Sequence, residues 1–181
     1  PMREALASVN QQINWVPGHI QAGRMGNWLE GAIDWAISRN RYWGTPLPIW
    51  TNDETGTMHC IGSRDELKAL TGVMVEDLHR EHVDDLTFTR EGEPGTYRRI
   101  PEVLDCWFES GSMPYAQLHY PFENQEVFNK GFPAEFISEA LDQTRGWFYT
   151  LIVLGSALYD KPAFKNVIVA GLVMAEDGKK M

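Results

Sequence analysis

Two short apolar runs separated by a long helical pattern dominate the C-terminal part of this 181-residue chain. We predict a buried strand over 135–138, a helix over 142–158 and a nearly continuous apolar strand over 166–173. A strand, a helix and a second strand in this order form a βαβ unit, whose two strands lie parallel in one sheet. The sequence therefore predicts an α/β fold with a parallel sheet.

A small α+β module is expected between residues 46 and 99. Prolines and turn residues over 45–62 predict a loop, a strand, a turn and a second strand. Ser63 and Glu66 form a capping box, so a short helix should follow and end near Gly72.

Three further elements complete the prediction. Residues 24–40 carry apolar side chains at helical spacing, which predicts an amphipathic helix. A strand over 103–109 and a short helix over 113–118 are expected after the small module.

A polar cluster follows the strand at 135–138. Glu139 and Asp142 lie where this strand gives way to a helix, and ligands of open α/β sheets bind at such junctions. Their carboxylates can accept hydrogen bonds from ribose hydroxyls or from an ammonium group. Alternatively, Asp142 only caps the helix, because aspartate is a preferred N-cap residue.

Two tryptophans are candidates for the wall of an apolar pocket. Trp107 is predicted near the end of one strand, and Trp147 lies within the helix predicted over 142–158. The alternative is that both side chains belong to the core, as large aromatic residues often do.

Composition restricts the environment and the partners of the chain. Its 25 acidic and 16 basic residues give a net charge of −9, which provides no basic surface for binding a polyanion unaided. Cys60 and Cys106 are too few for a disulfide framework and suit a reducing cytoplasm. No signal peptide or membrane-spanning run is recognisable, so we expect a cytoplasmic protein without a membrane partner.

The ends of the chain suggest a piece of a longer polypeptide. The chain starts at Pro1 rather than at a methionine, and it stops soon after a predicted turn at 176–178. We expect the remainder of that polypeptide to be a partner of this chain.

Four ordered blocks resemble the class I aminoacyl-tRNA synthetases for branched aliphatic amino acids: residues 24–48, 105–112, 139–148 and 166–181. The residues at 142–148 look like the form found in isoleucyl-tRNA synthetases. The resemblance implies three parts: a helical connection after the editing domain (1–45), a small inserted module similar to a degenerate zinc ribbon (46–99), and the second half of a Rossmann-type nucleotide-binding catalytic domain (100–181).

The resemblance also implies roles for individual residues. Trp107 and Trp147 would flank the isoleucine side chain, and Gln143 would lie beside the bound amino acid and its adenylate. Glu139 and Asp142 would correspond to groups near the ribose and the ammonium group.

The last block carries the nucleotide-binding part of the resemblance. The backbone of Gly171, Leu172 and Val173 would form the adenine-binding edge. Lys180 would open the Lys-Met-Ser-Lys-Ser loop, which stabilises the ATP phosphates, and the catalytic role is therefore assigned to it.

Departures from the family weaken some assignments. Many relatives have glycine where Ala140 stands, and many bacterial ones have histidine where Ala170 stands. Arg39 and Arg41 are candidates to assist the tRNA acceptor end, but surface salt bridges are the alternative.

Zinc is not expected in the small module. Some relatives hold zinc there through paired cysteines, whereas this module contains only Cys60. His59, His79 and His82 are potential further ligands, but the adjacent His59 and Cys60 make an awkward pair. These histidines are expected to be solvent-facing or structural.

The resemblance implies that the full enzyme activates isoleucine with magnesium-bound ATP and transfers it to tRNA(Ile). Such chemistry depends on positioning and charge stabilisation rather than on a protein nucleophile. The chain lacks the family's His-x-Gly-His signature, so we expect it to be inactive alone. Two alternatives remain: a structural or interaction module without measurable ligand binding, and a nucleotide-binding enzyme of another kind, such as a nucleotidyl transferase.

Overall fold

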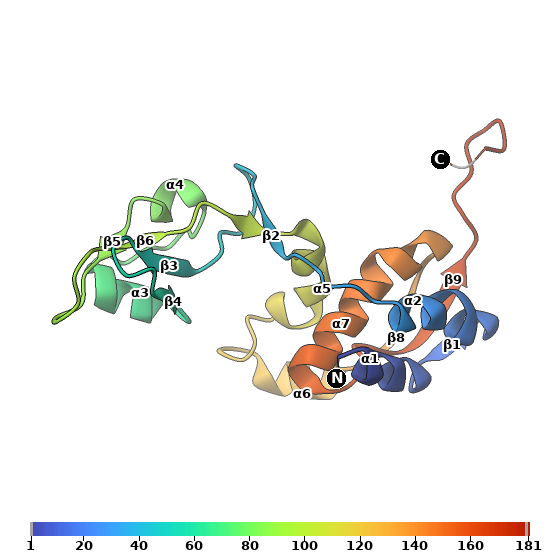
Figure 1. Ribbon diagram of the computed structural model, residues 1–181. Coiled ribbons are helices and arrows are strands. Elements are labelled where there is room, and N and C mark those ends of the chain that lie inside the picture. Colours follow the sequence, from blue (N-terminus) through green and yellow to red (C-terminus); the bar gives the residue numbers. More distant parts are fainter. Residues whose placement is uncertain (1, 180) are drawn as a thin grey trace. The chain divides into compact units, whose positions relative to one another are not determined.

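The computed structural model describes residues 2–179 and 181, and it divides the chain into two compact units (Figure 1). The larger unit comprises the residues up to 35 together with those from 107 onward, and the smaller unit comprises residues 36–106. The module predicted over 46–99 lies within the smaller unit. Each unit is described separately.

The larger unit is built on a parallel three-stranded sheet with the order β1-β9-β8. Its strands are β1 (Asn14–Val16), β8 (Ala134–Ala140) and β9 (Phe164–Ala170). The chain passes from β8 to β9 through a 3-10 helix, η2 (Leu141–Arg145), and helix α7 (Trp147–Tyr159). The predicted βαβ unit and its parallel strands are therefore confirmed.

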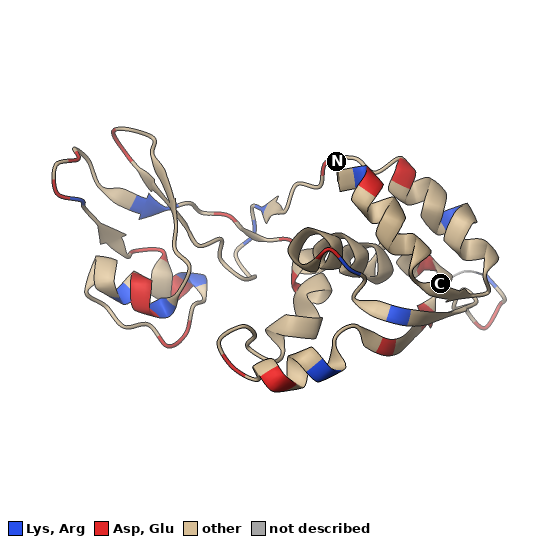
Figure 2. Cartoon of the chain, turned by 90° about the horizontal axis from the view of Figure 1, so that it is seen from below, with Lys and Arg blue, Asp and Glu red and all other residues tan. Residues whose placement is uncertain are grey.

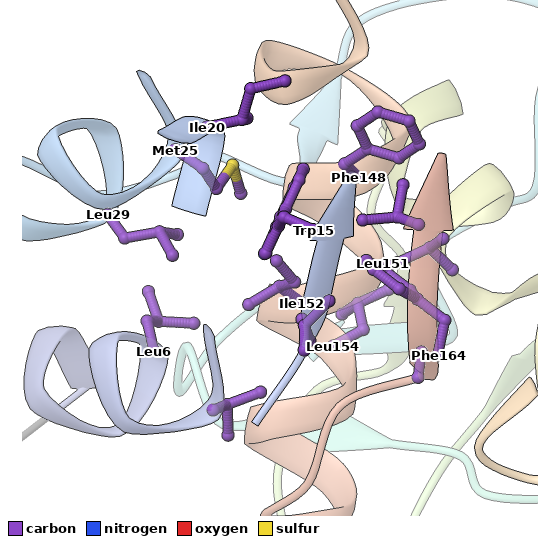
Figure 3. Packing of buried hydrophobic residues seen from close by; sticks show 14 of the residues in the cluster. Leu6, Trp15, Ile20, Met25, Leu29, Phe148, Leu151, Ile152, Leu154 and Phe164 are labelled. Carbon is purple, nitrogen blue, oxygen red and sulfur yellow. The ribbon is translucent and has the colours of Figure 1, made fainter. Parts of the chain in front are cut away.

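Helix α7 fills the centre of the hydrophobic core. It carries no charged residue (Figure 2), and Phe148, Leu151 and Ile152 are almost completely buried. Trp15 on β1 meets Phe148 edge to face, with ring centroids 5.8 Å apart. Figure 3 shows how these side chains pack with Leu6 and others from the N-terminal helices. Those helices are α1 (Met2–Gln11), the π-helix η1 (Gln21–Met25) and α2 (Gly26–Glu30).

The helix predicted over 24–40 is much shorter in the structure. Gly31 ends α2 by donating its N–H to the carbonyl of Asn27, and the chain is non-helical from Ala32 to Ile37. The apolar spacing continues beyond Gly31, but Ile33 and Ile37 are 74% and 37% exposed, so this segment has no continuous buried face to support a longer helix.

The strand predicted over 103–109 is mostly helix. Only Val103–Leu104 (β7) is extended, and α5 (Cys106–Ala116) begins directly afterwards. A short apolar run does not distinguish a strand from a buried helix, which explains the error. A separate helix, α6 (Gln125–Gly131), follows α5.

Strand β8 is less buried than predicted. Phe136 is 60% exposed, and Val16 and Ile168 are about half exposed. The register places Val16 beside Ile168 and Phe136 beside Asn166, so these exposed side chains share one face of the sheet. Helix α7 lies against the other face, where Val167 is buried.

The smaller unit contains a four-stranded antiparallel sheet with the order β4-β3-β6-β5. Its strands are β3 (Ile49–Asn52), β4 (Met58–Cys60), β5 (Thr87–Phe88) and β6 (Tyr97–Arg99). Helices α3 (Arg64–Thr71) and α4 (Arg80–Val83) accompany the sheet, and β2 (Ser38–Arg39) pairs with β7.

The predicted start of α3 at the N-cap residue Ser63 is confirmed, although the return bond of the capping box goes to Gly62 rather than to Ser63. The Ser63 hydroxyl accepts from the N–H of Glu66 at 3.1 Å, and Gly72 ends the helix with a φ of +77°. The Glu66 carboxylate reaches back to the N–H of Gly62 at 2.7 Å. The strands predicted on either side of the turn correspond to β3 and β4.

Candidate functional site

The carboxyl ends of β8 and β9 lie side by side, because Ala140 and Ala170 are paired in register. Glu139, at the end of β8, and the segment 171–173, directly after β9, therefore lie at the same edge of the sheet. The Glu139 side chain and all three residues of this segment are exposed. This edge is where open parallel sheets bind ligands.

The turn η2 connects this edge to α7 through the side chain of Gln143. Its Oε1 accepts a hydrogen bond from the backbone N–H of Trp147 at 2.9 Å. Its Nε2 donates to Asp142 Oδ2 at 3.3 Å. The side-chain acceptor at the start of α7 is thus Gln143 and not Asp142, so the alternative that Asp142 caps the helix is wrong. The Asp142 carboxylate is exposed instead.

Two residues that were not among the predicted site residues hold η2 in place. Thr144 is fully buried, and its hydroxyl donates to the carbonyl of Leu141 and accepts from Arg24 Nε, both at 2.8 Å. The guanidinium of Arg145 lies over the ring of Trp28, 4.7 Å from its centroid. These contacts link the turn to η1 and α2, and sequence spacing gave no sign of them.

Helices α5 and α7 make close contact near their N-terminal ends. A Cβ atom on Gly111 would lie 2.9 Å from Thr150 Cβ, so only glycine permits this approach. Trp147 Nε1 donates to the carbonyl of Ser110 at 3.0 Å. The structure therefore brings the start of α5 beside the start of α7.

Trp107 and Trp147 belong to these two helix starts. Trp107 lies in the first turn of α5 and is 43% exposed, so the alternative that it is a core residue is wrong. The edge of its indole lies against Gly146, the residue before Trp147. Trp147 is partly buried and packs against the hydrophobic core. Gln143 and the two tryptophans thus surround the start of α7.

A turn near the C-terminus follows this site. Asp177 accepts from the backbone N–H of Lys179 at 3.1 Å, and its carboxylate lies 2.9 Å from Lys179 Nζ. The Lys179 side chain and backbone N–H lower the pKa of Asp177 below its usual value. Lys180, the predicted catalytic residue, lies outside the described residues.

The candidate tRNA-contacting arginines differ in their surroundings. Arg39 forms an ion pair with the carboxylate of Asp105, which is buried, whereas the alternative to a tRNA contact was a salt bridge at the surface. Arg41 is exposed, and its carbonyl accepts from Arg80 at 2.9 Å.

The histidines of the smaller unit have protein partners. Arg90 donates to His59 Nδ1 at 2.9 Å, so His59 Nε2 carries the proton that Glu66 accepts at 2.9 Å. His79 and His82 both lie beside Asp77. Cys60 is exposed. Within residues 2–179 and 181, no three histidine, cysteine or acidic residues are grouped so that they could hold a metal ion.

The described part of the chain also contains no helix that is both long and apolar enough to cross a membrane.

Comparison with known proteins identifies the class of protein to which the chain belongs. The family described as tRNA synthetases class I (I, L, M and V) matches residues 1–181, and the chain belongs to this family.

The most similar relatives considered are isoleucine-tRNA ligases. The chain is 63% identical over 180 residues to that of Treponema denticola, 62% over 180 residues to that of Protochlamydia amoebophila, and 58% over 182 residues to the cytoplasmic one of Arabidopsis thaliana. Each match covers 99% of this chain but only 16%, 17% and 15% of the relative, in that order. The chain thus spans about a sixth of these relatives.

A solved structure supports the fold. The LeuRS of Agrobacterium radiobacter K84 (agnB2), crystallised as a LeuRS-tRNA-LeuAMS ternary complex, matches with a TM-score of 0.57 and 21% identity. The match covers 92% of this chain and 23% of that one. At this identity the likeness concerns the fold alone.

Proposed function

We propose that the chain is the part of an isoleucine-tRNA ligase that binds isoleucine and one edge of ATP. The proposal rests on one observation: the side chains of Trp107, Gln143 and Trp147 lie together at one end of α7, beside the carboxyl edge of a parallel sheet. The 63% identity to the Treponema denticola ligase supports the choice of isoleucine.

In this proposal the parallel sheet belongs to a Rossmann-type nucleotide-binding domain, of which residues 100–181 form the second half. Residues 1–45, which also supply β1 to this sheet, lead into it from an editing domain, and residues 46–99 form an inserted module similar to a degenerate zinc ribbon. The enzyme works in the cytoplasm, which suits the free thiols of Cys60 and Cys106.

The proposed amino acid site uses apolar walls and polar ends. The half-exposed indole of Trp107 and the ring of Trp147 offer flat apolar surfaces to a branched aliphatic side chain. The exposed carboxylate of Asp142 can accept hydrogen bonds from the ammonium group, and Glu139 can accept them from the ribose hydroxyls. Gln143 lies between these parts, since it contacts both Asp142 and the start of α7.

The nucleotide would enter as its magnesium complex and lie along the edge after β9. The backbone of Gly171, Leu172 and Val173 would hold the adenine, and Lys180 would stabilise the phosphates. The isoleucine carboxylate then attacks the α-phosphorus, a new P–O bond forms, and pyrophosphate leaves. In the second step a ribose hydroxyl of tRNA(Ile) attacks the acyl carbon, and AMP leaves. Both steps rely on alignment of the reactants and on charge stabilisation.

A chimeric enzyme tests this proposal. The segment of the Treponema denticola ligase that matches this chain is replaced by the chain, and ATP-pyrophosphate exchange is measured with and without isoleucine. We expect isoleucine-dependent exchange that Trp107→Ala weakens strongly. Phe122→Ala, which removes an aromatic ring that is 64% exposed, is the matched control and should leave exchange unchanged. A folded chimera without isoleucine-dependent exchange would contradict the proposal.

The isolated chain gives a second test. We expect it to catalyse no exchange but to release heat on binding an isoleucyl-adenylate analogue in calorimetry, and Trp107→Ala should abolish that heat. Absence of heat from the unsubstituted, folded chain would favour the alternative of a structural module that binds no ligand by itself.

A further inference from the structure

Two proposed binding residues, Gln143 and Trp107, both lie close to the backbone of Gly146. This glycine is buried between η2 and α7. A Cβ atom built on Gly146 would lie 2.6 Å from Gln143 Oε1, and 3.0 Å and 3.3 Å from Cη2 and Cζ3 of Trp107. Carbon atoms in favourable contact are about 3.5–4.0 Å apart. Neither side chain could keep its present position beside any residue other than glycine.

The two contacts are not easily relieved. Gln143 Oε1 accepts from the N–H of Trp147, so moving it away breaks the hydrogen bond that starts α7. Trp107 is a rigid bicyclic ring on α5, and α5 is itself held against α7 by the close contact of Gly111 with Thr150. Because α5 cannot retreat without losing that contact, the indole itself must shift, by about a few tenths of an ångström, to make room for a Cβ atom.

We propose that Gly146 is a positioning residue that fixes Trp107 and Gln143 relative to each other and so sets the shape of the isoleucine site. This inference rests on the proposed function. Gly146 does not itself touch the amino acid. It acts by providing a bare stretch of backbone against which the indole edge and the amide oxygen both rest.

The test uses the chimeric ligase with Gly146→Ala, alone and combined with Trp107→Phe. Phenylalanine lacks the distal ring atoms of tryptophan, including Cη2, and therefore removes the second collision. We expect Gly146→Ala to raise the KM for isoleucine about tenfold, in line with the cost of overpacking, and to change the KM for ATP less than about twofold. In the Trp107→Phe background only the collision with Gln143 Oε1 remains, so the same substitution should raise the KM for isoleucine by a smaller factor.

Gly131→Ala is the matched control. Gly131 ends α6, and an added Cβ there meets no atom within 4 Å, so both KM values should remain unchanged. Circular dichroism and thermal unfolding are recorded for every variant. If Gly146→Ala alone prevents folding, recovery of folding by Trp107→Phe supports the collision with the indole, and continued failure overturns the part of the proposal that concerns Trp107.

Two results would overturn the role of Gly146 in an active chimera. One is an unchanged KM for isoleucine. The other is an equal rise in both tryptophan and phenylalanine backgrounds, which would mean that Trp107 is not displaced. A folded but inactive unsubstituted chimera contradicts the proposed function itself, and the role of Gly146 with it.

Discussion

Gln143 has a structural contact and a proposed ligand contact, and two substitutions separate them. Gln143→Met keeps the length of the side chain but removes the acceptor for the N–H of Trp147. Loss of a capping acceptor costs about 1 kcal/mol. For a chain of this size such a loss lowers Tm by about 2–4 °C. Gln143→Glu keeps an acceptor at the same distance along the side chain, and its negative charge at a helix N-terminus is favourable, which offsets its repulsion by the exposed carboxylate of Asp142. Its Tm should change little.

The two substitutions should affect the KM for isoleucine differently from the way they affect Tm. If the Gln143 amide donates to the bound amino acid, both substitutions remove that donor. A hydrogen bond to a charged group is worth about 1.5–3 kcal/mol, which corresponds to a KM for isoleucine about 10- to 150-fold higher. A loss of about 1 kcal/mol in stability cannot produce this change, because a protein stable by about 5–15 kcal/mol remains almost fully folded.

The assay compares thermal unfolding of the 181-residue chain with isoleucine-dependent pyrophosphate exchange by the chimera. We expect Gln143→Glu to have a nearly unchanged Tm and a strongly raised KM, and Gln143→Met to be impaired in both. A normal KM for the Gln143→Glu chimera would refute the ligand contact. A normal Tm for Gln143→Met would refute the capping contribution.

Two further predictions concern stability. Phe148→Ala leaves a cavity at a fully buried site in the core and should lower the free energy of unfolding by about 3–5 kcal/mol in urea titrations. The exposed control Phe122→Ala should lower it by less than about 0.5 kcal/mol. A similar loss for both variants would contradict the packing described. Hydrogen bonds from backbone N–H groups, together with Arg98 or histidine partners, lower the pKa values of Asp53, Glu66 and Asp77 below their model-compound values of 3.8, 4.5 and 3.8. A lowered pKa in the folded state adds stability above the unfolded-state pKa that is lost as the pH falls through the folded-state pKa. The smaller unit should therefore lose stability below about pH 4.5, as followed by circular dichroism. Glu66→Gln should remove part of this pH dependence. An unchanged pH dependence in the Glu66→Gln variant would contradict the contribution of the Glu66 carboxylate.

The larger elements were predictable where periodicity and turn chemistry agreed. The βαβ unit was recognisable because two apolar runs flank a long helix, and α3 because Ser63 and Gly72 mark its two ends. Strand β1 was missed because three residues carry no readable period. The helix over 24–40 was overextended because its apolar spacing continues past Gly31, where packing no longer supports it.

The candidate site was predictable from the sequence only in part. The sequence indicated which residues gather at the sheet edge, because strand ends follow from the order of elements. It did not indicate that Trp107 starts a helix, or that Gln143 rather than Asp142 accepts from the N–H of Trp147. The start of α5 is missed because a short apolar run fits a strand and a helix equally well, and the Gln143 contact depends on the 3-10 geometry of η2, which no apolar pattern records.

The charges at the sheet edge bear on why the chain should be inactive alone. Glu139 and Asp142 are exposed carboxylates, which suit an ammonium group and ribose hydroxyls but repel the phosphates of ATP. Two arginines at this turn have contacts within the unit: Arg24 of η1 donates to Thr144, and Arg145 of η2 lies over Trp28. In the proposed ligase we therefore expect the cations for the triphosphate to come with the magnesium ion, from Lys180 or from the remainder of the polypeptide. It follows that the isolated chain should bind isoleucine-like groups better than it binds ATP.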